Sequence, residues 1–178
     1  DAQTSKKLSD VTRKTLDLMW KTQGASGAWA WPKCGWAPME VDDHYGVTLA
    51  ALTVGIEPDG YAESDLAKAG LARVRAYLKD NPAPSLHHRT MIAWASLRVG
   101  GLMEEQTRKS VLEEVLSKQL PDGGWSTPAL LIDWKEFRRK DGKPHDPNTS
   151  DASGTGLAIV FARGMGIVAG NGSLRKGI

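Results

Sequence analysis

The sequence predicts an all-α fold of about three helical hairpins, arranged as part of an α/α solenoid or toroid. Three observations indicate this: apolar residues recur at helical spacing, helix-stop signals separate the segments, and amphipathic segments alternate with apolar ones. A chain of 178 residues suits one domain with a core of its own. We therefore treat residues 1–178 as a single domain.

The first hairpin is predicted from residues 6–22 and 43–55. Residues 6–22 carry apolar side chains at helical spacing between charged ones, which is typical of an amphipathic helix. Residues 43–55 are much more apolar, and Gly55 followed by Pro58 marks their end. An outer and an inner helix are the expected pair.

The same alternation occurs twice more. Residues 63–80 are amphipathic, with Ser64 as the expected N-cap, and residues 85–99 are apolar. Residues 104–119 are amphipathic again, and residues 151–166 are apolar and rich in small residues. A helix buried on nearly all sides needs neighbours on both faces, whereas a helix with one polar face lies outside. This order predicts an inner row of apolar helices covered by an outer row.

The connection at residues 121–150 carries four of the nine prolines. Proline disfavours regular helix, so we expect an irregular excursion here, with a short helix at residues 131–139.

Two internal repeats support the hairpin arrangement. Residues 23–29 and 119–125 share the pattern Q-x-x-x-G-x-W, each at the end of an amphipathic segment. Residues 43–50 and 151–158 share D-x-x-G-x-x-L-A, each at the start of an apolar one. The glutamine, glycine and indole of the first pattern are suited to clasp the end of a helix. The middle hairpin lacks both patterns.

Q-x-x-x-G-x-W after an amphipathic helix resembles the QW motif of the squalene and oxidosqualene cyclases. GAWAW at residues 27–31 and EVDD at residues 40–43 are similar to the G-W-Y-F and D-x-D-D stretches of the bacterial squalene-hopene cyclases. This resemblance implies a partial α/α toroid of the terpenoid cyclase and prenyltransferase superfamily. It also implies that residues 1–178 are a piece of a longer chain.

The resemblance assigns roles to the acidic cluster. It implies that Asp42 is the general acid that protonates a terminal alkene, and that Glu40 and Asp43 tune it. Such an acid must be neutral in a dry pocket, and clustered carboxylates favour this because like charges cannot all ionise together.

A helix N-cap is the competing interpretation of an acid at this place. The repeat pairs Asp43 with Asp151, where no acidic cluster exists, so we assign capping to Asp43. The charges of Asp42 and Glu40 are then unexplained by the fold.

Aromatic and histidine side chains are the predicted ligand contacts. They are Trp31, Trp36, Tyr45 and His88, with Trp134 as a further candidate in a loop. We expect His87 and His88 to begin an inner helix, one ring packed and the other wet, with one of them near Asp42.

Charge, motif spacing and the length of apolar runs bear on four further questions: nucleic-acid binding, cofactors, membrane contact and cellular compartment. With a net charge of +2 and the 23 basic and 21 acidic residues interspersed, we expect no nucleic-acid partner. The chain shows no Cys-x-x-Cys or His-x-x-x-His spacing, and we expect no metal or organic cofactor. No apolar run approaches the ~18 residues of a membrane span, so at most the chain contacts a membrane surface. The single cysteine, Cys34, leaves the compartment open.

The leading hypothesis is therefore a class II terpene-cyclase-like domain, an isomerase, that protonates or binds a polyisoprenoid. Three hairpins alone cannot exclude water from a cation, whereas a homodimer of two half-rings could close one toroid. The alternative is a non-catalytic α/α-toroid module that binds a protein or an apolar ligand. A zinc-dependent subunit resembling the prenyltransferases is the third hypothesis.

Overall fold

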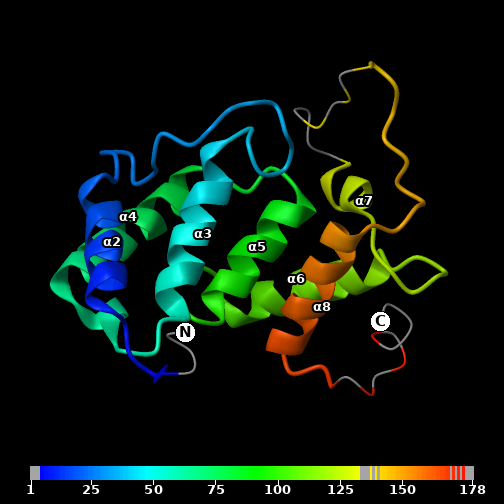
Figure 1. Ribbon diagram of the computed structural model, residues 1–178. Helices are drawn as coiled ribbons and strands as arrows, with labels where there is room; N and C mark the ends of the chain where they lie inside the picture. Colours follow the sequence, from blue (N-terminus) through cyan, green and yellow to red (C-terminus); the bar gives the residue numbers. More distant parts are fainter. Residues whose placement is uncertain are drawn as a thin grey trace.

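The protein is all-α, as the sequence predicts (Figure 1). This computed structural model describes residues 5–132, 137, 139, 141–168, 170, 172 and 174. Within these residues no strand forms, and the β-type pairing is confined to one isolated antiparallel bridge between Trp36 and Glu40. The arrangement of the hairpins as part of a closed ring stays a prediction.

The six long helices occupy the six predicted segments. They are α2 (Asp10–Lys21), α3 (Asp43–Gly55), α4 (Asp65–Asp80), α5 (Leu86–Ser96), α6 (Glu105–Ser117) and α8 (Ala152–Gly164). A short 3-10 helix, η1 (Tyr61–Glu63), precedes α4, and Ser64 caps α4 by accepting a hydrogen bond from the backbone N–H of Ala67. The periodicity therefore located the helices, and five of the six long ones begin at a side chain that accepts a hydrogen bond from the first turn, α6 being the exception.

The long connection contains a short helix, which begins before the segment 131–139 where the sequence predicts one. Helix α7 spans Thr127–Leu131, with Ser126 as its N-cap and Pro128 in its first turn. A proline is tolerated there because the first-turn N–H has no intrahelical partner. Most of the predicted segment 131–139, namely residues 133–136 and 138, lies outside the described residues, as does Trp134.

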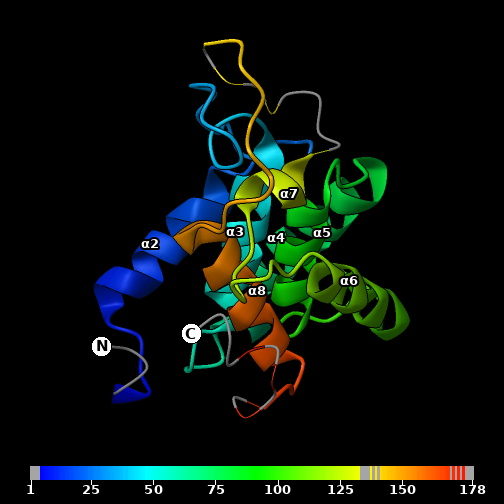
Figure 2. The ribbon, with the colours of Figure 1, turned by 90° about the vertical axis from the view of Figure 1, so that its right-hand side faces the viewer.

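The helices form two layers (Figures 1 and 2). Helix α5 lies between α3 and α8, and these three apolar helices make one layer. On the other side α4 packs against α3, α2 packs against α4, and α6 packs against both α5 and α8. The predicted inner and outer rows are thus present over the three hairpins.

Helix α5 belongs to both hydrophobic clusters of the core. One cluster joins it to α2, α3 and α4 through side chains such as Trp20, Val47 and Val74. The other joins it to α6 and α8 through Trp125 and Phe161. The half-buried Trp94 of α5 packs against both clusters. A helix in this position is buried on nearly all sides: nine of its eleven residues are buried, four of them polar.

The two Q-x-x-x-G-x-W repeats adopt the same hydrogen-bonded clasp. The indole N–H of Trp29 donates to the carbonyl of Met19 at 2.8 Å, and that of Trp125 donates to the carbonyl of Val115 at 2.7 Å. Gln23 and Gln119 each donate to the carbonyl of the glycine four residues later, both at 2.7 Å. Those glycines, Gly27 and Gly123, have φ angles of 90° and 92°. Each clasp satisfies carbonyls at the end of an outer helix.

The glycine of the D-x-x-G repeat is required by close packing. A Cβ at Gly46 would lie 2.4 Å from the ring of Trp31, and a Cβ at Gly154 would lie 2.7 Å from the backbone nitrogen of Thr127. Trp31 and Thr127 each stand two residues after the tryptophan of a clasp. Both inner helices therefore press against the loop that follows a clasp.

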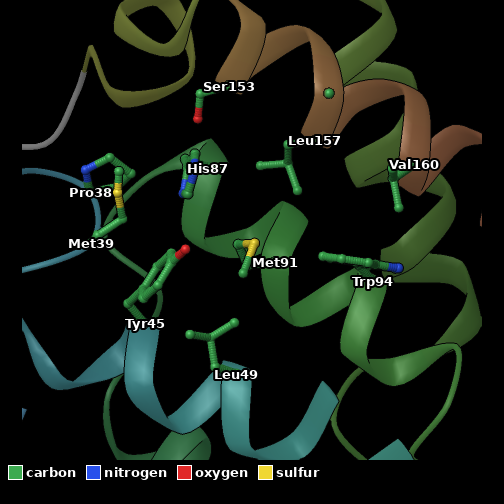
Figure 3. A pocket seen from close by; sticks show the side chains of 11 residues that line it. Pro38, Met39, Tyr45, Leu49, His87, Met91, Trp94, Ser153, Leu157 and Val160 are labelled. Atoms are coloured by element: carbon green, nitrogen blue, oxygen red, sulfur yellow. The ribbon is translucent and has the colours of Figure 1, made fainter. Parts of the chain in front are cut away.

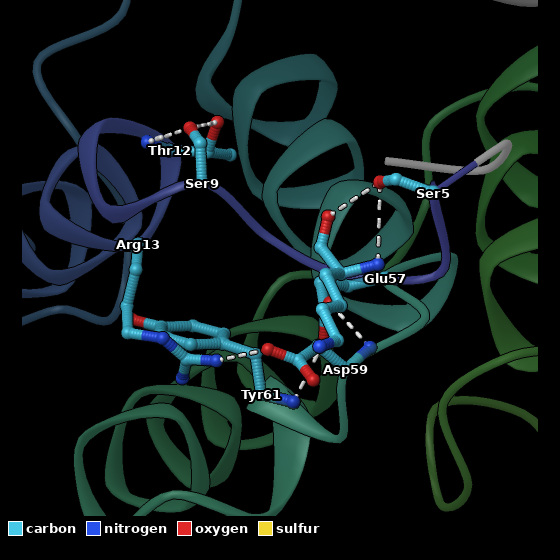
Figure 4. A network of polar contacts seen from close by, with 8 residues as sticks. Ser5, Ser9, Thr12, Arg13, Glu57, Asp59 and Tyr61 are labelled. Carbon is cyan, nitrogen blue, oxygen red and sulfur yellow. Dashed lines mark hydrogen bonds and ion pairs between the residues drawn. The ribbon is translucent and has the colours of Figure 1, made fainter. Parts of the chain in front are cut away.

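A polar network holds α2 to the turn before α4 (Figure 4). Arg13 of α2 pairs with Asp59 at 2.5 Å and lies over the ring of Tyr61, 5.6 Å from its centroid. Glu57 accepts from the backbone N–H groups of Asp59 and Tyr61, and the hydroxyl of Tyr61 donates to Asp17 of α2 at 2.7 Å. These contacts orient the first outer helix.

Two glycine substitutions should have opposite effects on stability. Gly70→Ala should lower the free energy of unfolding by about 1–3 kcal/mol, because its Cβ would lie 2.1 Å from the buried ring of Trp20. Gly156→Ala in α8 should raise it by about 0.5–1 kcal/mol, because no atom lies within 4 Å of the new methyl group. Urea unfolding measures both, and equal effects of the two variants would contradict the packing.

Candidate functional site

A pocket lies between the three inner helices, and none of the described residues that line it belongs to an outer helix (Figure 3). Its volume is about 360 Å³. Its walls are Tyr45 and Leu49 of α3, His87, Met91 and Trp94 of α5, Ser153, Gly156, Leu157 and Val160 of α8, and Pro38 and Met39 of the loop before α3. Most of these side chains are apolar, so the pocket suits an apolar ligand.

Helical spacing brings these residues together. The lining positions on α3 are four residues apart, and those on α5 and α8 recur after three or four. Residues at that spacing share one face of a helix. Each inner helix therefore presents one stripe to the pocket, as the sticks in Figure 3 show. Val160 is 43% exposed at the rim, so the pocket opens to solvent.

His87 is the buried titratable group of the pocket. Its side chain is 4% exposed, and its Nδ1 has no hydrogen-bond partner among the described residues. Burial, with a smaller contribution from repulsion by His88, lowers the pKa of His87 to about 4. The imidazole is consequently neutral near pH 7 and has hydrogen-bonding capacity to spare.

His88 lies behind the pocket, between two polar partners. Its Nδ1 is 2.7 Å from the hydroxyl of Ser85, which caps α5, and its Nε2 is 3.2 Å from Oδ2 of Asp42. The side chain is 3% exposed, so both histidines are buried, and the expectation of one wet ring is wrong. The expected proximity of one histidine to Asp42 is confirmed.

The predicted division of roles between the two aspartates is corrected by the structure. Asp42, not Asp43, is the N-cap of α3, and its Oδ1 accepts from the backbone N–H of His44 at 3.0 Å. Asp43 is the first helical residue and pairs with Lys33 at 3.2 Å. The repeat misled because Asp42 stands four residues before Gly46, whereas the cap of α8, Asp151, stands three before its glycine.

Asp42 combines the cap with the histidine contact. Burial alone would raise the pKa of Asp42, but the contacts with His88 and His44 outweigh it and hold the pKa below its usual value. The side chain is 26% exposed and does not line the pocket. The group is therefore an anion near pH 7 that orients His88.

The remaining predicted residues build the loop before α3. Trp31 donates from its indole to the carbonyl of Met39 at 2.6 Å, and its ring lies 6.1 Å from that of Tyr45. Glu40 donates its backbone N–H to the carbonyl of Trp36 at 2.8 Å, which closes a turn. Trp36 itself is 63% exposed.

Of the four predicted ligand contacts, only Tyr45 lines the pocket. Trp31 and Trp36 shape the loop that supplies Pro38 and Met39, and His88 stands one residue beyond the lining residue His87. Sequence reasoning missed Met91 and Trp94, which belong to no motif, and Leu157, which is the leucine of the D-x-x-G-x-x-L-A repeat. The signal that could have found them is the stripe shared by three apolar helices.

Neither a cluster of metal-ligating side chains nor a membrane-spanning helix occurs in the described part of the chain. There, no three His, Cys, Asp or Glu side chains are grouped so that they could hold a metal ion, and Cys34 is exposed. No described helix has both the length and the apolar character needed to cross a membrane.

Comparison of the chain with protein-family models, with curated proteins and with solved structures gives no match in any of the three.

The burial of His87 should make the folded protein sensitive to acid. Between pH 6.5 and about 4 the unfolded chain binds a proton at this residue that the folded chain does not, so stability present above pH 6.5 is lost as the pH falls. His87→Leu should remove up to about 3 kcal/mol of that loss. Urea unfolding from pH 4 to 8 measures it, and parallel curves for both proteins would contradict a neutral buried His87.

Proposed function

We propose that this chain binds an apolar ligand of the polyisoprenoid type in the pocket between α3, α5 and α8. One observation carries the proposal: three inner helices each turn an apolar stripe toward a common hollow, and one buried neutral histidine interrupts it. Ligand pockets are commonly apolar with few polar groups that orient the ligand. The resemblance to the squalene cyclases motivates the choice of ligand class.

The size of the pocket limits what it can hold. Small-molecule pockets have volumes of about 300–1,000 Å³, and this one, at about 360 Å³, is at the lower end. It therefore suits a short isoprenoid, or one segment of a longer one. Each Å² of apolar surface removed from water contributes about 25 cal/mol, so a snug fit along the three stripes is the main source of affinity.

Protonation of a polyisoprenoid by Asp42 is the second candidate, and the contact between Asp42 and His88 favours it. A lowered pKa makes the protonated carboxyl a stronger proton donor. The same lowering makes the protonated form rare near pH 7, and Asp42 does not line the pocket. Binding is accordingly the function that the geometry supports better.

Binding can be tested by filling the pocket from Gly156. This residue lines the pocket, and no atom lies within 4 Å of a Cβ built on it. Gly156→Leu should therefore occupy the pocket without disturbing the fold, and should weaken binding of the fifteen-carbon alcohol farnesol by about tenfold or more. Titration followed by intrinsic tryptophan fluorescence or by calorimetry measures the affinity. Gly156→Ala is the matched control, and equal affinities of the Leu and Ala variants would refute this pocket.

Catalysis can be tested with squalene and with farnesol, followed by product analysis by gas chromatography and mass spectrometry. At pH 7 we expect recovery of the unchanged probe, because Asp42 is ionised there. If Asp42 is a proton donor, product should appear only at acidic pH and should be absent with Asp42→Asn. The Asn variant retains a good N-cap, so it separates the charge from the cap. Cyclised product at acidic pH that this variant abolishes would show that the protein catalyses cyclisation and does not only bind the ligand.

A further inference from the structure

The pocket does not end at Trp94. A second hollow of about 560 Å³ adjoins it, and Trp94 and Val160 line both. The second hollow lies toward the C-terminal ends of α5 and α8, and its aliphatic walls are Leu97, which follows α5, Ile56, which follows α3, and Ile159 and Val160 of α8. The two adjoining hollows lie along the inner layer and share two wall residues, and we call them together the inner groove.

Two arginines, Arg98 and Arg163, line the far end of the inner groove. Both are exposed, and neither has a carboxylate or hydrogen-bonding side-chain partner in the part of the chain that the structure describes. Arg98 also borders a neighbouring hollow that contains Glu63, but the carboxylate of Glu63 pairs with Lys68 at 3.1 Å. Among the described residues, no acidic side chain lines the inner groove.

An apolar groove that ends on two cations is complementary to an amphiphile with an anionic head. The planar guanidinium group binds carboxylate and phosphate through paired hydrogen bonds, and such charge-assisted bonds are stronger than neutral ones. An uncharged hydrocarbon would leave both arginines without a counter-charge.

A helix-end effect is the alternative explanation for these cations. Arg163 lies in the last turn of α8 and Arg98 follows the end of α5, where the helix dipole favours positive charge. Lys21 and Lys79 stand in the last turns of α2 and α4 in the same way, but neither lines the inner groove. These two lysines therefore provide a control for the dipole effect.

We infer that the ligand of the inner groove is an amphiphile whose carboxylate or phosphate head binds Arg98 and Arg163, while its apolar chain runs past Trp94 into the pocket. This inference rests on the proposed function, since it places the chain of the ligand in the same pocket. It assigns a head-binding site at the opposite end of the groove from His87.

The test compares three probes that share one fifteen-carbon chain: farnesol, farnesoic acid and farnesyl monophosphate. Calorimetric titration at low ionic strength should show at least one of the anionic probes binding about tenfold or more tightly than farnesol. The better of the two identifies the head as carboxylate or phosphate. Because the arginines are exposed, the preference should shrink as salt is raised from about 0.01 M to about 1 M. Equal affinities for all three probes would overturn the inference.

Charge variants locate the effect. In the double variant Arg98→Gln/Arg163→Gln, the ratio of the affinity for the anionic probe to the affinity for farnesol should fall to about one. The control Lys21→Gln/Lys79→Gln loses the same charge from helix ends, and it should keep the ratio of the unaltered protein. A preference that survives in the arginine variant, or disappears in the lysine variant, would overturn the inference. Farnesol binding that is absent, or unaffected by Gly156→Leu, would instead refute the proposed function. Thermal unfolding confirms that both variants are folded, and the salt dependence tests the head-binding site on the unaltered protein.

Discussion

The burial of α5 between two partners is the constraint on which the rest of the structure depends. A helix that packs against α3 on one side, α8 on the other and α6 behind has almost no surface left for polar groups. Its polar residues therefore need local partners: Thr90 donates to the carbonyl of Leu86, and Ser96 donates to that of Ala93. Both hydrophobic clusters of the core include residues of α5. The burial of this helix therefore stabilises the packing of the two clusters against each other.

The same constraint explains why histidines gather at the start of α5. The helix begins where three elements meet, so its first turn is buried, and an imidazole ring is cheaper to bury there than a permanently charged side chain. His88 satisfies both ring nitrogens through Ser85 and Asp42. His87 has the pocket in front of it and an Nδ1 without a hydrogen-bond partner among the described residues. One position along the helix thus separates a structural histidine from one that a ligand can reach.

Asp42 shows how one side chain can connect a cap to a buried network. Its two carboxylate oxygens serve different elements, one the N-terminus of α3 and the other the ring of His88 in α5. The first contact needs only local sequence, because a cap acts within its own turn. Burial raises the pKa of the group, and the second contact makes the largest contribution to lowering it. That contact exists only because α3 and α5 are neighbours. An acidic cluster in a sequence is consequently a weak guide to whether each of its carboxyl groups is protonated or ionised in the folded protein.

The sequence by itself determined the all-α class, the six long helices, their alternation and the clasps at Trp29 and Trp125. Periodicity, caps and glycine turns act over a few residues, so they can be recognised without the fold. The tertiary structure alone decided which aspartate caps α3, which histidine lines the pocket, and that Trp94 stands between two hollows. These outcomes depend on how Tyr45, Met91 and Leu157, far apart in the chain, meet across three helices, and helix packing is set by shape complementarity over the whole core.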